Sequence, residues 1–190
     1  MQFSLIESLL VTALPVLFLI VLFGGGALFR RREIDMDGTP PIDKRIYLPA
    51  KYSIVVLWAA TAARSWGAGI SPVQVPEPSR WIALALWVFG FGLLFAGRIG
   101  LGASFRIGSP LEKTGLRTSG LFRFSRNPMY LGIYSTVLAS FLYTLNPIVL
   151  ALAIFVVAVH HRIVVAEERY LIGAFGDEYA DYCCRVRRYI

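Results

Sequence analysis

The stretch NPMYLGIYSTVLASFLYTLNPIVLALAIFVVAVHH, residues 127 to 161, contains no lysine, arginine or acidic residue and decides the fold. It is about twice as long as the roughly 20 residues that an α-helix needs to cross a bilayer. Asn146 and Pro147 stand near its centre, and this dipeptide is typical of a turn. The stretch therefore predicts a tight hairpin of two transmembrane helices, over residues 129–145 and 147–164.

Three more hydrophobic segments precede the hairpin, at residues 6–28, 48–66 and 81–100. Of the 190 residues, 56% are hydrophobic and only 16% are charged, a balance that does not suit a soluble protein. Three arginines follow the first segment, where a signal peptide would have small residues and a cleavage site, so we expect a mature helix there. The glycines of the third segment favour close helix packing through small residues.

These segments together predict the fold class. We expect an all-α integral membrane helical bundle of about five transmembrane helices, ending in the helical hairpin and a short cytoplasmic helix. One membrane domain would cover residues 1–190. The proline-containing stretches 32–45 and 71–80 are expected to be loops.

The lysines and arginines set the orientation of such a bundle. They gather at residues 30–45, 106–126 and 169–188, and with five spans all three groups can lie on one side. We predict that this side is cytoplasmic, with the amino terminus outside and the carboxy terminus inside. The net charge of +7 then anchors the protein against anionic lipids, and no basic stripe with stacking aromatic residues indicates nucleic-acid binding.

The segment 98–127 is too polar to span the membrane and too rich in glycine for a regular helix. Long loops in compact proteins are usually functional or disordered, and its spaced leucine and phenylalanine residues argue against disorder. We expect this segment to pack on the cytoplasmic face of the bundle.

Two histidines and two glutamates follow the hairpin. His160 and His161 are each seven residues before Glu167 and Glu168, so each pair shares a face of a continuous helix. Two helical turns span about 10.5 Å, which is too far for one metal ion to be bound by both members of a pair. We expect no metal site, which leaves either a solvated helix end or a site for another ligand.

The carboxy-terminal part of the chain carries motifs of a known superfamily. Arg126, Asn127, Pro128, Tyr130 and Gly132 open the hairpin, the glutamate pair follows it, and Phe-Gly-Asp-Glu-Tyr begins at residue 175 before a basic end. This order resembles the isoprenylcysteine carboxyl methyltransferase and phospholipid methyltransferase superfamily over roughly the last 75 residues. Two departures stand out: Asn127 replaces the typical histidine of the box, and Ile163 occupies a position that holds arginine in better-studied relatives, with Arg162 and His161 beside it.

The resemblance implies an integral-membrane methyltransferase that uses S-adenosylmethionine and acts on a lipophilic acceptor, either an isoprenylcysteine carboxylate or a phospholipid amine. Residues 1–100 would then be variable spans, and residues 101–190 the cofactor-binding loop, hairpin and tail. The partners would be a lipid or prenylated substrate and the bilayer. A membrane reductase of the sterol-reductase type and a non-enzymatic membrane scaffold are the alternatives.

The resemblance also implies site residues. Arg126 would hold the cofactor carboxylate through bidentate hydrogen bonds, and Glu167 or Glu168 would accept from its ammonium or ribose. We prefer Glu168, because Leu171 and Ile172 follow it as an apolar pair suited to packing inward. The full cofactor-binding set is Arg126, Asn127, Tyr130, Glu167, Glu168, Leu121 and Phe122, and the catalytic candidates are Glu168, His161, Arg162 and Tyr130.

Overall fold

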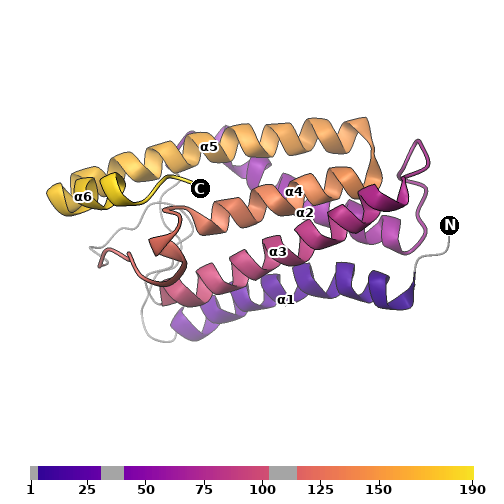
Figure 1. The fold of residues 1–190 in the computed structure, drawn as a ribbon, viewed down its shortest axis with the longest axis horizontal. Coiled ribbons are helices and arrows are strands. Elements are labelled where there is room, and N and C mark those ends of the chain that lie inside the picture. Colours follow the sequence, from indigo (N-terminus) through magenta and orange to yellow (C-terminus); the bar gives the residue numbers. More distant parts are fainter. Residues whose placement is uncertain (1–3, 31–40, 103–114) are drawn as a thin grey trace.

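The structure is a computed structural model that describes residues 4–30, 41–102 and 115–190, and residues 23–30 by their backbone alone. Its elements are α1 (Leu5–Arg30), α2 (Lys44–Ser65), α3 (Glu77–Leu101), the short 3-10 helix η2 (Gly120–Arg123), α4 (Pro128–Thr144), α5 (Pro147–Phe175) and α6 (Asp177–Arg185). The five long helices run side by side, and α6 lies at the end of the bundle opposite the start of α1 (Figure 1). The predicted all-α membrane bundle is confirmed.

Four described helices, α1, α2, α3 and α5, are long and apolar enough to cross a membrane. The fourth expected span is α4, a 17-residue helix that packs against α2, α3 and α5 within the bundle. Helix α5 runs to Phe175, past residue 164, where the predicted membrane span ends. Glu167 and Glu168 therefore lie on the second helix of the hairpin. Parts of the loops expected at 32–45 and 98–127, namely residues 31–40 and 103–114, lie outside the described residues.

The hairpin turn between α4 and α5 forms where the sequence predicts it. Leu145 takes a left-handed conformation (φ 45°) and its N–H donates to the Phe141 carbonyl at 2.7 Å. The Asn146 side chain caps α5 by accepting from the Ile148 N–H at 2.8 Å, and it donates to the Ile70 carbonyl at 2.7 Å. Proline at the first helical position needs no amide partner. The Asn146 side chain therefore stabilises the turn and connects it to the loop before α3.

The closest helix contact in the bundle joins α3 to α4, through glycine. A Cβ atom on Gly90 would lie 2.9 Å from the Gly132 carbonyl oxygen, and one on Gly132 would lie 2.7 Å from the Gly90 carbonyl oxygen. Gly97 likewise leaves room for the Met129 side chain. Small residues let these two backbones meet, as expected for the glycine-rich span, and they fix the start of α4 against α3.

This contact gives a prediction for stability. Gly132→Ala should lower the free energy of unfolding by about 1–3 kcal/mol, because its methyl group would overlap backbone and the Leu94 side chain. Gly92→Ala is the matched control, since its Cβ would meet nothing within 4 Å. Thermal unfolding of the detergent-purified variants measures the difference. Equal unfolding temperatures for the two variants would contradict the close contact.

Aromatic side chains fill the middle of the bundle. Phe18 of α1, Trp58 of α2 and Phe91 of α3 are buried, and the Trp58 and Phe91 ring centroids lie 4.9 Å apart. The Trp58 indole N–H donates to the Thr136 hydroxyl of α4 at 3.1 Å. Phe18 and Trp58 also border a cavity, so the packed core ends where this cavity begins.

Candidate active site

A cavity of about 380 Å³ opens at the end of the bundle where α2 and α4 begin. Its walls come from α1 to α6 and from the described segment 115–122. Apolar side chains of α1 and α2 line it, namely Phe18, Leu19, Leu22, Ile54, Val55 and Trp58. Its charged and hydrogen-bonding groups include Lys51, Arg117, Arg126, Asn127, Tyr130, His160 and Glu167. The cavity therefore combines an apolar surface on α1 and α2 with polar groups from several elements.

One face of α5 supplies a wall of the cavity. His160, Ile163, Glu167 and Leu171 all line it, and they recur every three or four residues along the helix. Ile163 therefore faces the cavity at the position where relatives carry arginine. Ile172, which we expected to pack inward beside Glu168, is 53% exposed.

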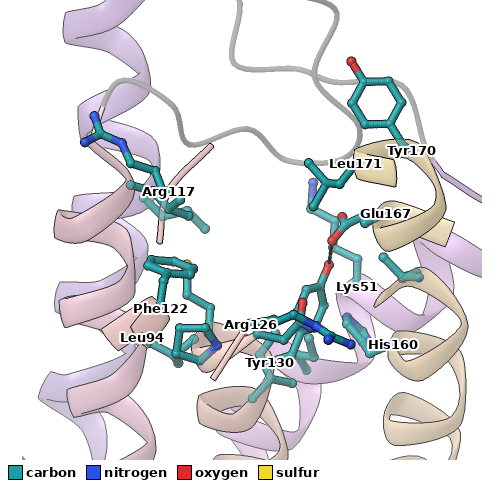
Figure 2. Close-up of a pocket in the computed structure, with 18 of the residues that line it drawn as sticks. Lys51, Leu94, Arg117, Phe122, Arg126, Tyr130, His160, Glu167, Tyr170 and Leu171 are labelled. Atoms are coloured by element: carbon teal, nitrogen blue, oxygen red, sulfur yellow. Dashed lines mark hydrogen bonds between the residues drawn. The ribbon is translucent and has the colours of Figure 1, made fainter. Parts of the chain in front are cut away.

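Glu167 is the carboxylate that lines the cavity. Its Oε2 accepts from the Tyr130 hydroxyl at 2.9 Å, the dashed contact in Figure 2. In the same view Phe122 lies across the cavity from Glu167. A carboxylate has about four lone-pair sites, so Glu167 keeps acceptor capacity after binding Tyr130. It can therefore accept hydrogen bonds from a ligand in the cavity.

His160, and not its neighbour His161, lines the cavity. Its Nδ1 lies 2.8 Å from the Val156 carbonyl oxygen. A carbonyl only accepts, so Nδ1 carries a proton and Nε2 is the acceptor of the neutral ring. His161 is exposed and contacts the Tyr189 hydroxyl at 2.8 Å, and Arg162 is exposed as well. The structure thus does not bring these two predicted catalytic residues to the cavity wall.

Glu168 is buried at 6% exposure, outside the set of cavity-lining residues. It accepts from Arg126 Nε at 3.1 Å, from Asn127 Nδ2 at 3.1 Å, and from Arg188 Nε at 2.9 Å. Neighbours on a helix point about 100° apart, which is why one glutamate of the pair faces the cavity and the other faces the chain beyond α6. The preference for Glu168 as cofactor ligand stays a prediction, and its surroundings favour a structural role.

Arg126 lines the cavity, but its guanidinium is already committed to protein partners. Nε and Nη2 donate to Glu168 at 3.1 and 3.4 Å, and Nη1 donates to the carbonyls of Cys183 and Val186 at 3.2 and 3.0 Å. Burial would lower the pKa of Arg126, but the hydrogen bond and charge of Glu168 outweigh it and raise that pKa, so the group stays charged. A guanidinium has five N–H groups, so at most one remains for a ligand. The bidentate grip that we predicted is not available in this arrangement.

The segment before α4 is held by α6. Phe122 is buried and lines the cavity, while Leu121 does not reach it. The buried hydroxyl of Tyr182 donates to the Phe122 carbonyl. Burial raises the pKa of Tyr182 to about 12, so the phenol keeps the proton that it donates. Helix α6 therefore fixes an aromatic wall of the site.

Lys51 is a cavity residue that the sequence did not single out as a site residue. It is half-buried on α2 and lines the cavity. Within the described ranges, no carboxylate lies within ion-pair distance of its ammonium. Its spacing from Tyr47 (i+4), which also lines the cavity, could have signalled a shared face, but nothing in the sequence says that this face meets α5.

The family model described as phospholipid methyltransferase matches residues 78–178, which include all of α4 and α5 and nearly all of α3. A search of curated proteins finds no match to the chain.

Proposed function

Because this chain belongs to the phospholipid methyltransferase family, we propose that it transfers a methyl group from S-adenosylmethionine to a lipophilic acceptor at the cytoplasmic face of the membrane. The observation that carries the proposal is a cavity in which apolar side chains of α1 and α2 meet polar groups of α2, α4 and α5. A water-soluble donor and a membrane-soluble acceptor need such a place to meet.

The residues present fit the donor. S-adenosylmethionine has a carboxylate, an ammonium, ribose hydroxyls and a flat adenine. Glu167 would accept from the ammonium or the ribose, and Lys51 would pair with the carboxylate, since Arg126 has at most one N–H to spare. Phe122 and the apolar part of segment 115–122 would cover the adenine. A cavity of about 380 Å³ lies within the usual range for small-molecule sites.

When bound, the donor supplies a methyl group attached to a positively charged sulfur. The protein's part is to position the reacting groups and to handle charge and protons. The Glu167 carboxyl group would accept hydrogen bonds from the donor beside that site, and Tyr130 holds it in place. A carboxylate acceptor needs no base, whereas an amine or thiol acceptor must lose a proton. His160 Nε2 and the Glu167 carboxyl group are cavity groups that could take it.

The acceptor would lie against the helices that border the bilayer. Phe18 and Leu22 of α1 and Trp58 of α2 line the apolar side of the cavity. Val55 lines it too and is 40% exposed. A hydrocarbon chain could therefore lie along α1 and α2 with its reactive end toward Glu167.

Incubation of the detergent-purified protein with methyl-radiolabelled S-adenosylmethionine and total membrane lipid tests the proposal. We expect label in the lipid fraction, and His160→Gln should reduce it only if the acceptor must lose a proton. Mild alkali distinguishes the acceptors, because it releases label from a methyl ester as volatile methanol, whereas label on an N-methyl amine stays in a non-volatile product. Arg123→Ala, a change at an exposed position outside the cavity, is the control. A lipid fraction without label would contradict the proposal and favour the non-enzymatic scaffold.

A further inference from the structure

Residues 186–190, which we call the tail, run along the start of α4. The Arg126 N–H donates to the Arg187 carbonyl at 3.0 Å, and the Ser125 hydroxyl and Asn127 Nδ2 donate to the Arg188 carbonyl at 3.3 and 3.2 Å. Three consecutive residues before α4 are thus bonded to backbone carbonyls of the tail. The tail fixes the backbone at the point where the chain turns into the hairpin.

Side chains of the tail reach both hairpin helices. Arg188 pairs with Glu168 of α5 through Nε at 2.9 Å and Nη2 at 2.8 Å. The Tyr189 hydroxyl lies 3.3 Å from the Tyr134 hydroxyl of α4 and 2.8 Å from His161 Nδ1 of α5. In Figure 1 the tail turns back from α6 toward the bundle. One short extended segment therefore bridges α4 and α5 at the cavity end.

The bridge lies behind the cavity wall. Arg126 and Asn127 line the cavity on one side, and on the other they bond to Glu168 and the tail. Glu168 is thereby shared between two guanidinium groups, one from the cavity wall and one from the tail. If Arg188 is lost, the buried Glu168 carboxylate loses one of its two guanidinium partners. Arg126 then pairs with a carboxylate that the tail no longer holds in position.

We propose that the tail is a latch that sets the donor-binding wall of the cavity from behind, and that Arg188 is its positioning residue. Arg188 is outside the set of cavity-lining residues, so it would act through Glu168, Arg126 and Asn127. The affinity for the donor should therefore depend on a residue that never contacts the donor. The donor readout rests on the proposed function, whereas the latch itself can be tested without any ligand.

Adjacent arginines provide a matched pair of variants. Arg188→Gln removes the charge that pairs with Glu168, while Arg187→Gln changes an exposed side chain and keeps the backbone carbonyl that Arg126 uses. We expect Arg188→Gln to weaken S-adenosylmethionine binding about fivefold to tenfold by calorimetry. Hydrogen exchange of peptides spanning residues 122–131 should also become several times faster. Arg187→Gln should match the unmodified protein in both measurements, and Arg188→Lys should recover part of the affinity.

Each outcome decides something. Unchanged exchange and unchanged affinity in Arg188→Gln would overturn the latch. If Arg188→Gln does not fold, Arg188→Lys with a lowered affinity and a normal unfolding temperature supports the latch, and normal affinity overturns it. If the unmodified protein binds no donor, the proposed function fails, while the exchange rates of the two glutamine variants still decide whether the tail holds the start of α4.

Discussion

Glu168→Ala should remove most of the folded protein, with a loss of about 3–5 kcal/mol in the free energy of unfolding. That is the range found when one partner of a buried ion pair is removed. Glu168 is buried and accepts from Arg126, Asn127 and Arg188. Without it, two guanidinium groups would stand close together at the mouth of the hairpin with no carboxylate between them. Thermal unfolding and the yield of monodisperse protein in detergent measure the effect.

The control for this prediction is Glu178→Ala in the first turn of α6. Glu178 is exposed, so its loss should change the free energy of unfolding by less than about 0.5 kcal/mol. An unfolding temperature of Glu168→Ala equal to that of Glu178→Ala would show that the buried network does not stabilise the protein.

Glu167→Gln should have the opposite profile, with donor binding lost and stability kept. Hydrogen bonds to charged groups contribute about 1.5–3 kcal/mol, which corresponds to roughly a tenfold to hundredfold loss of affinity. The amide keeps the size of the side chain and can still accept from the Tyr130 hydroxyl. Calorimetry with S-adenosylmethionine on detergent-purified protein gives the affinity, and thermal unfolding gives the stability.

Arg162→Gln is the matched control, because Arg162 is an exposed charge on the same helix outside the cavity. Tyr130→Phe should give a smaller loss than Glu167→Gln, since it keeps the carboxyl group itself in the cavity. If Glu167→Gln and Arg162→Gln bind the donor equally well, the cavity carboxylate has no role in binding. The position of the donor in the cavity would then have to be reconsidered.

Hydropathy and turn residues were enough to predict the helices, because a membrane helix must satisfy its own backbone groups and shows this as a long apolar run. The turn at Asn146 and Pro147 and the close packing of the glycine-rich third span followed from local chemistry. The partner of that span, α4, did not, and neither did the full length of α5, whose predicted membrane span ends at residue 164 while the helix continues to Phe175. The orientation of the bundle in the membrane stays a prediction.

The sequence predicted which segments meet at the site, but not which side chains face the cavity. The motif residues Arg126, Asn127 and Tyr130 do line the cavity. Which member of the glutamate pair faces it depends on where the tail folds, and the tail is ordered by contacts that no local pattern encodes. No local pattern determines which of His160 and His161 faces the cavity either, since neighbours on a helix point about 100° apart. Lys51 enters the cavity only because α2 packs against α5.

The short turn between α4 and α5 has a consequence for how the protein is made. Helix α4 has 17 residues, or about 25 Å, less than the roughly 30 Å of a hydrocarbon core. Five of its buried side chains, Ser135, Thr136, Ser140, Tyr143 and Thr144, carry hydroxyl groups. Too short to span the hydrocarbon core on its own, α4 is tied by the turn directly to α5, which is long and apolar enough to cross a membrane. We therefore expect α4 to remain uninserted during synthesis until α5 has left the ribosome, and the two helices to enter the bilayer together as one pair.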